Sequence, residues 1–156
     1  MRVIWLVCLL AAPIAASEPA STAATLVVHV TQIKRVESDP DRPRADRLLV
    51  SLFDQEEGFP NGKDEAKDAR ILSVDGEEMD IQFEGLTPGV YAVAIIHDEN
   101  GNGRVDLKKA LFVPVGLAEG YGASNGAKAA FGPPKFRDAK FAVHAPRTDI
   151  TISLEY

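Results

Sequence analysis

The sequence LTPGVYAVAII, residues 86–96, places a Pro-Gly turn two residues before a tyrosine and then continues as an apolar run. A tyrosine at this position can return its hydroxyl to the backbone of the turn while its ring joins the core, as in the tyrosine corner of β-sandwiches. Residues 91–96 are apolar on both faces, so they suit an interior strand. The stretch therefore predicts a β-sandwich and gives Tyr91 a structural role.

Strand patterns continue on both sides of this stretch. Residues 79–84 and 149–156 alternate between apolar and polar side chains, as strands do when one face lies on the core and the other in water. The other expected strands are 26–30, 48–53, 69–74 and 140–144. About seven short strands separated by turn signals predict an all-β, two-sheet sandwich of the immunoglobulin-like or transthyretin-like kind.

Residues 107–138 interrupt this rhythm with many glycines and prolines. An irregular segment of this length inside a compact domain is usually functional or disordered. Its aromatic residues Tyr121, Phe131 and Phe136 are of a kind that disordered segments tend to lack. We therefore expect a long, ordered glycine-rich loop packed against the sandwich. The sequence offers a short helix only at residues 63–67.

The N-terminal residues have the three regions of a secretory signal peptide. Arg2 is positive, residues 3–12 are apolar, and Ala15-Ala16-Ser17 fits cleavage after Ser17. Cleavage would leave 139 of the 156 residues, which is the size of one domain. We therefore expect a signal peptide at 1–17 and a single β-sandwich domain at 18–156.

Cysteine content and net charge limit which cellular compartment and which classes of partner are expected. Cys8 is the only cysteine and would leave with the signal, and an exported domain without disulfides favours a bacterial periplasmic or secreted protein. Loss of Arg2 changes the formal charge from −6 to −7. An acidic domain gains no electrostatic attraction to nucleic acid or anionic lipid. No later segment is long and apolar enough to predict a helical membrane span.

Residues 98–106 carry oxygen-bearing side chains at alternating positions. Counted as an EF-hand-type calcium loop, they give Asp98 at position 1, Asn100 at 3, Asn102 at 5, Gly103 at 6, the Arg104 carbonyl at 7 and Asp106 at 9. Position 12 should be a bidentate glutamate but is Lys109. The missing carboxylate must come from elsewhere or from water, and Glu119 is the best-placed candidate. Two formal carboxylates predict weak binding, with a Kd of about 10⁻⁴–10⁻³ M.

Two other interpretations of this loop stay open. Asn-Gly pairs form turns readily, and Asp98 and Asn100 could cap the backbone of a tight, solvated loop that binds nothing. His97 could instead favour zinc. The other histidines, His29 and His144, lie on separate expected strands without ligand spacing, so a strand-end histidine with a structural hydrogen bond is the simpler interpretation.

Sequence signatures of an enzyme are absent. The chain has no Gly-x-Ser-x-Gly elbow, no phosphate-binding loop and no His-Glu-x-x-His motif. Glu119 and Asp98 could form an acid–base pair across a cleft, as in some hydrolases, but this needs a distance that the sequence does not give. We therefore expect a protein that is not an enzyme and that binds no cofactor other than calcium.

Four motifs occur in order along the chain: PGVYAVA at 88–94, HDENGNG at 97–103, EGYGASN at 119–125 and GPPKFRDAKF at 132–141. This series resembles the bacterial exported family catalogued as domain of unknown function 2141. The resemblance covers most of residues 25–156. It implies an exported β-sandwich without an established activity.

Together these observations favour a non-catalytic periplasmic or secreted binding module. Calcium in the 98–106 loop would fix the glycine-rich segment, and Tyr121, Ser124, Asn125 and Phe136 would present a surface to a protein or glycan partner. The alternative is a purely structural envelope-interaction domain without a metal site. A hydrolase that uses Glu119 or Asp98 is the less favoured third hypothesis.

Overall fold

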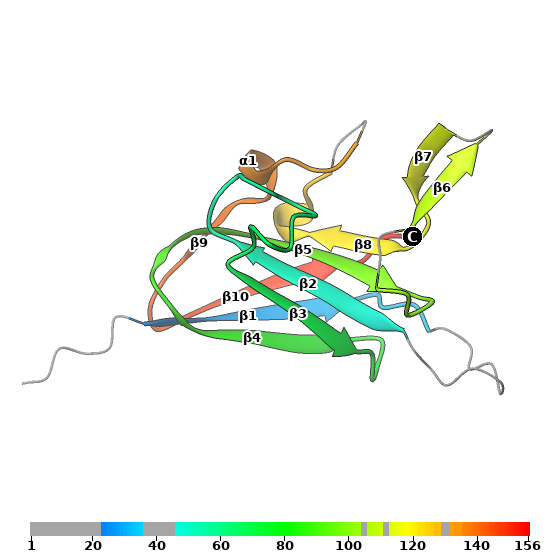
Figure 1. Cartoon of the computed structure of the whole chain (residues 1–156). Coiled ribbons are helices and arrows are strands. Elements are labelled where there is room, and N and C mark those ends of the chain that lie inside the picture. Colours follow the sequence, from blue (N-terminus) through cyan, green and yellow to red (C-terminus); the bar gives the residue numbers. More distant parts are fainter. Residues whose placement is uncertain (1–22, 36–45, 104–105, 111–112, 129–131) are drawn as a thin grey trace, which may run out of the picture.

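A computed structural model of the chain describes residues 23–35, 46–103, 106–110, 113–128 and 132–156 (Figure 1). Eight strands in this part form two sheets, and a further pair forms a separate hairpin. The sheets pack face to face, so the predicted all-β, two-sheet sandwich is confirmed. The expected signal peptide lies outside the described residues and stays a prediction. No helix in the described ranges is long and apolar enough to cross a membrane.

The two sheets are built from strands that are far apart in sequence. The three-stranded sheet has the order β10 (Arg147–Ser153), β1 (Ala24–Thr31) and β4 (Met79–Leu86). The five-stranded sheet has the order β3 (Asp68–Ser73), β2 (Arg47–Phe53), β5 (Gly89–Asp98) and β8 (Gly120–Ala123), and β9 (Phe141–Val143) also pairs with β5. β1 runs parallel to β10 and antiparallel to β4. All seven expected strands are present.

Alternate residues of both sheets fill the core between them. The contributing side chains include Leu26, Val28, Val30, Leu48, Val50, Leu52, Ile81, Phe83, Val93, Ile95, Ile152 and Leu154. Each large apolar side chain buried in this way contributes roughly 1.5–3 kcal/mol relative to exposure. The period-two pattern of the sequence therefore places the core correctly.

The predicted tyrosine corner is confirmed at the start of β5. The Tyr91 hydroxyl donates a hydrogen bond of 2.8 Å to the carbonyl of Thr87. The ring itself is buried and belongs to the core cluster. Tyr91 therefore ties the turn to the sandwich, and its role is structural.

A second, smaller cluster covers the outer face of the five-stranded sheet. Ala92 of β5 packs there with Ala123, Ala127 and Ala139, beneath the partly buried rings of Phe59 and Phe136. Phe59 stands edge-on to Phe136, with ring centroids 5.9 Å apart. The small alanine side chains of this cluster leave room for the two rings, so the connections that carry Phe59 and Phe136 pack on this face of the sheet.

The glycine-rich segment holds more regular structure than expected. It contains β6 (Leu107–Ala110) and β7 (Val113–Leu117), which form an antiparallel hairpin, followed by β8, the 3₁₀ turn η1 (Ser124–Gly126) and the short helix α1 (Phe136–Ala139). The helix expected at residues 63–67 is wrong, because this part forms turns. A five-residue segment is too short to nucleate a helix without packing support.

Glycines in this segment allow close approach of the last strand region. A Cβ at Gly122 would come within 2.6 Å of Ile152 Cγ2, and one at Gly120 would run into the ring of Tyr156. The Tyr121 and Glu155 backbones exchange two hydrogen bonds, of 2.9 and 2.8 Å. The chain after β10 therefore crosses from the first sheet to the edge of the second.

Candidate functional site

Five of the six predicted ligand residues lie together at one end of the sandwich. Asp98 is the last residue of β5, Asp106 immediately precedes β6, and Glu119 separates β7 from β8. Asn100 and Asn102 lie in the loop between Asp98 and Asp106. The sixth residue, Arg104, lies outside the described residues.

The loop winds around the carboxylate of Asp98, which is fully buried. Its Oδ1 accepts a hydrogen bond of 3.1 Å from the backbone N–H of Asn102, and its Oδ2 accepts one of 2.7 Å from that of Gly103. Gly101 and Gly103 have φ values of +70° and +71°, in the left-handed region that favours glycine. The Asn-Gly repeats thus give the loop the curvature that aims its amides at Asp98.

Asp106 closes the loop from the other side. Its Oδ2 accepts hydrogen bonds from the side-chain Nδ2 atoms of Asn100, at 2.7 Å, and Asn102, at 2.8 Å. The amide nitrogens, and not the oxygens, therefore face this carboxylate. The Asn100 Oδ1 instead accepts a hydrogen bond of 3.0 Å from the backbone of Asn102.

Glu119 brings a buried carboxyl group against this loop. The side chain is 4% exposed, and its Oε2 accepts a hydrogen bond of 3.1 Å from the backbone N–H of Asp106. Its Oε1 is buried without a hydrogen-bond partner in the part of the chain that the structure describes. Burial raises the pKa of Glu119; the Asp106 amide opposes this, and the charges of Asp98, Asp106 and Glu99 add to it. Burying an unpaired polar atom is costly.

The arrangement does not form a finished metal centre. Among the described residues, no group of three or more His, Cys, Asp or Glu side chains is placed to hold a metal ion. Asp98 and Asp106 instead accept hydrogen bonds from the loop. Calcium binding by Asp98, Asn100, Asn102, Arg104, Asp106 and Glu119 therefore stays a prediction.

The residue before the loop is anchored by groups that the sequence analysis missed. His97 is fully buried; its Nδ1 lies 2.9 Å from the Tyr156 hydroxyl, and its Nε2 lies 3.6 Å from Oδ2 of the buried Asp46. The Tyr156 hydroxyl also accepts a 2.7 Å hydrogen bond from the Lys34 backbone. Lys34 in turn forms an ion pair with Glu99 at 3.2 Å. These contacts hold the end of β5 in place, and they fit the structural interpretation of His97.

Residues 41–151 match a family described as an uncharacterized protein conserved in bacteria, DUF2141. The chain belongs to this family. The match spans most of the sandwich and includes the whole 98–106 loop and Glu119, and it confirms the resemblance drawn from the four motifs. No curated protein and no solved structure matches the chain.

In this DUF2141 chain, Ser124 has a structural position, and the expectation that it presents a partner surface is wrong. It is 1% exposed; its Oγ accepts a hydrogen bond of 2.9 Å from the Val93 N–H and donates one of 2.7 Å to the Ala139 carbonyl. β9 pairs with β5 up to Tyr91, and β8 pairs with β5 from Ala94 onward. The Ser124 hydroxyl therefore gives the Val93 N–H a hydrogen-bond acceptor, in the short stretch of β5 that pairs with neither β8 nor β9.

The other three residues of the expected surface stay exposed or partly exposed, so their role toward a partner stays a prediction, and they also make structural contacts. The Asn125 Nδ2 donates a hydrogen bond of 2.8 Å to the Lys140 carbonyl, and Phe136 packs edge-on against Phe59. Tyr121 is half-buried and pairs through its backbone with Glu155. Residues of the EGYGASN and GPPKFRDAKF motifs of this DUF2141 chain thus connect the glycine-rich segment to β5 and to each other.

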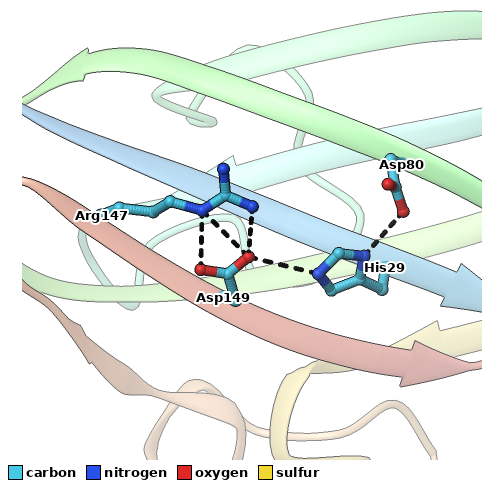
Figure 2. A network of polar contacts seen from close by, with 4 residues as sticks. All are labelled: His29, Asp80, Arg147 and Asp149. Carbon is cyan, nitrogen blue, oxygen red and sulfur yellow. Dashed lines mark hydrogen bonds and ion pairs between the residues drawn. The ribbon is translucent and has the colours of Figure 1, made fainter.

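A polar network on the outer face of the three-stranded sheet was also missed (Figure 2). His29 of β1 lies between two carboxylates: Nδ1 is 2.7 Å from Asp80 of β4, and Nε2 is 3.3 Å from Asp149 of β10. Arg147 forms a forked ion pair with Asp149. Hydrogen bonds to Asp80 and then Asp149 raise the pKa of His29, and Arg147 foremost lowers the pKa of Asp149 to about 2.

Proposed function

We propose that this chain is an exported, non-catalytic binding module whose 98–106 loop, together with Glu119, binds a calcium ion. The observation that carries this proposal is the Glu119 carboxylate. It is buried, one of its oxygens has no partner among the described residues, and it lies close enough to Asp98 and Asp106 for their charges to raise its pKa. A bound cation would satisfy the unpaired oxygen and offset the repulsion.

The side chains at this site have the chemistry that calcium prefers. Calcium takes six to eight oxygen ligands from carboxylates, amides and backbone carbonyls. Asp98, Asp106 and Glu119 supply carboxylates, and Asn100 and Asn102 supply amide groups that now face Asp106 through nitrogen. Half a turn of each amide exchanges nitrogen for oxygen and converts two donors into two ligands. Metal binding also requires the three carboxylates to move closer, because the described residues do not place three of them to hold an ion.

Export is part of the same proposal. The expected signal peptide at 1–17 supports it, and so does the weak affinity expected for the loop, since calcium sites of extracellular modules work at about 10⁻⁴–10⁻³ M. A protein or a glycan is the expected partner of such a periplasmic or secreted module.

Calorimetric titration and thermal denaturation of the mature protein, from Glu18 onward, test the proposal. With about 10 mM calcium chloride and a Kd of about 10⁻⁴–10⁻³ M, linkage predicts about 1.4–2.7 kcal/mol of added stability. The protein should also give a saturable heat of binding. An absence of both effects in the chelator-treated protein at this calcium concentration would refute the metal site.

Two variants separate the site from general effects of charge. Glu119→Gln keeps the shape of the side chain but removes its charge, and it should abolish most of the calcium-dependent stabilisation. Glu84→Gln makes the same change at an exposed glutamate of β4, which lies outside the 98–106 loop. This control should leave the response to calcium intact. An equal loss in both variants would point to non-specific screening.

The second candidate function is a structural envelope-interaction domain without a metal site. It is favoured by Asp98, whose two carboxylate oxygens are already satisfied by the amides of the loop. In this case, alanine at both Asp98 and Asp106 would change stability by the same amount with and without calcium. A hydrolase that uses Glu119 or Asp98 is less favoured, since these bonds leave Asp98 poorly placed to act on a substrate.

A further inference from the structure

The β6–β7 hairpin stands apart from both sheets of the sandwich. Its strands pair with each other from Leu107↔Leu117 to Ala110↔Val113. In the part of the chain that the structure describes, neither strand joins the three-stranded or the five-stranded sheet. Figure 1 shows the hairpin projecting beyond the end of β5. A two-stranded hairpin is only marginally stable in water unless something supports it.

The candidate cation site lies at the base of this hairpin. The Asp106 carbonyl accepts a hydrogen bond of 2.8 Å from the Ala118 N–H, and the Asp106 N–H donates one of 3.1 Å to Glu119 Oε2. Asp106 thus joins the incoming and outgoing chains. The third carboxylate, on Asp98, belongs to the end of β5. Three carboxylates that repel one another therefore lie where the chain leaves the sandwich to form the hairpin and where it returns.

We propose that the bound cation clasps the base of the β6–β7 hairpin, so that the backbone order of the hairpin depends on the cation. This inference rests on the proposed function. Among the described residues no three such side chains are placed to hold a metal, so a divalent ion would have to draw Asp98, Asp106 and Glu119 together. It would then connect the end of β5, the start of β6 and the chain after β7. It would replace repulsion at the base with attraction, and any opening that separates the two chains there would also break the site.

Amide hydrogen exchange of the mature wild-type protein measures this coupling. If opening of the hairpin releases the cation, its exchange slows by the factor 1 + [Ca²⁺]/Kd. At about 10 mM calcium and a Kd of about 10⁻⁴–10⁻³ M, the amides of β6 and β7 should slow about 10- to 100-fold. Short labelling times report local opening, so residues 54–67, in the turns between β2 and β3, serve as an internal control and should be unchanged.

Calorimetry on the same sample distinguishes the two ways in which the inference can fail. Calcium binding together with slowed exchange confined to the hairpin supports the clasp. Calcium binding with unchanged hairpin exchange overturns the clasp but leaves the proposed function standing. No calcium binding overturns both. Because the comparison is made in wild-type protein with calcium or with chelator, no variant has to fold, and Glu119→Gln, where it folds, should lose the slowing.

Discussion

Replacement of Ser124 by alanine is expected to destabilise the domain by about 2–4 kcal/mol. The hydroxyl accepts a hydrogen bond of 2.9 Å from the buried Val93 N–H and donates one of 2.7 Å to the Ala139 carbonyl. A buried donor left without a partner costs about 1–3 kcal/mol, and the second lost bond adds about 0.5–1.5 kcal/mol. The Ala139 carbonyl keeps a long contact of 3.4 Å with Asn125 Nδ2. The expected loss of stability is therefore smaller than the sum of the upper values of the two costs.

Equilibrium unfolding in urea measures this loss as a shift of the midpoint at constant slope. Ser73→Ala is the matched control, because Ser73 is an exposed residue of β3 and its replacement should change the free energy of unfolding by less than about 0.5 kcal/mol. A loss in Ser124→Ala no larger than in this control would refute the role of the hydroxyl in the gap between β8 and β9.

Three further predictions concern the sandwich. Because the pKa of His29 is raised in the fold, its contacts add stability below about pH 6.5, and this stability is lost as pH rises through the folded pKa. Because the pKa of Asp149 is lowered to about 2, its contacts add stability above about pH 3.8, and this stability is lost as pH falls towards 2. The difference in Tm between wild type and His29→Gln should therefore be largest between about pH 4 and 6.5 and shrink at higher pH. Gly122→Ala forces a Cβ to within 2.6 Å of Ile152 Cγ2, so urea unfolding should show a loss of about 1–3 kcal/mol. Tyr91→Phe removes the hydrogen bond to the turn and should cost about 0.5–1.5 kcal/mol in the same assay.

Each of these predictions has a control that should leave stability nearly unchanged. His144→Gln removes a histidine outside the network and should leave Tm nearly unchanged. Gly89→Ala adds a Cβ that meets its neighbours only at 3.6 Å or more. Tyr121→Phe removes a hydroxyl from a half-buried ring. A variant that behaves like its control would contradict the contact assigned to it.

The core strands were predictable because their information is local. Alternation along residues 79–84 and 149–156 specifies which side chains face inward, and the tyrosine corner is encoded within six residues. The glycine-rich segment was not predictable in the same way. Gly120 and Gly122 weaken any strand pattern, yet β8 forms because those glycines admit Tyr156 and Ile152. Contacts between residues so distant in sequence leave no periodic signal.

Prediction of the candidate site from sequence also succeeds where the information is local and fails where it is not. Spacing brought out Asp98, Asn100, Asn102 and Asp106, because ligands on one short loop must lie near one another. Only its place in the glycine-rich segment points to Glu119, and the structure puts its carboxylate against the Asp106 amide.

Three features of the site region left no usable pattern. The direction of each amide of the loop, the burial of Ser124 and the contact of His97 with Asp46 and Tyr156 depend on tertiary packing. The local sequence does not encode that packing.

The parallel pairing of β1 with β10 has a consequence for the order of events in folding. β1 occupies the centre of its sheet, but its register with β10 joins residues such as Thr25 and Arg147. The central strand therefore lacks one neighbour until nearly the whole polypeptide has been synthesised. Folding that depends on such distant pairings is slow. The three-stranded sheet therefore cannot be completed before the C-terminal strand is made, which suits a protein proposed to leave the compartment in which it is made.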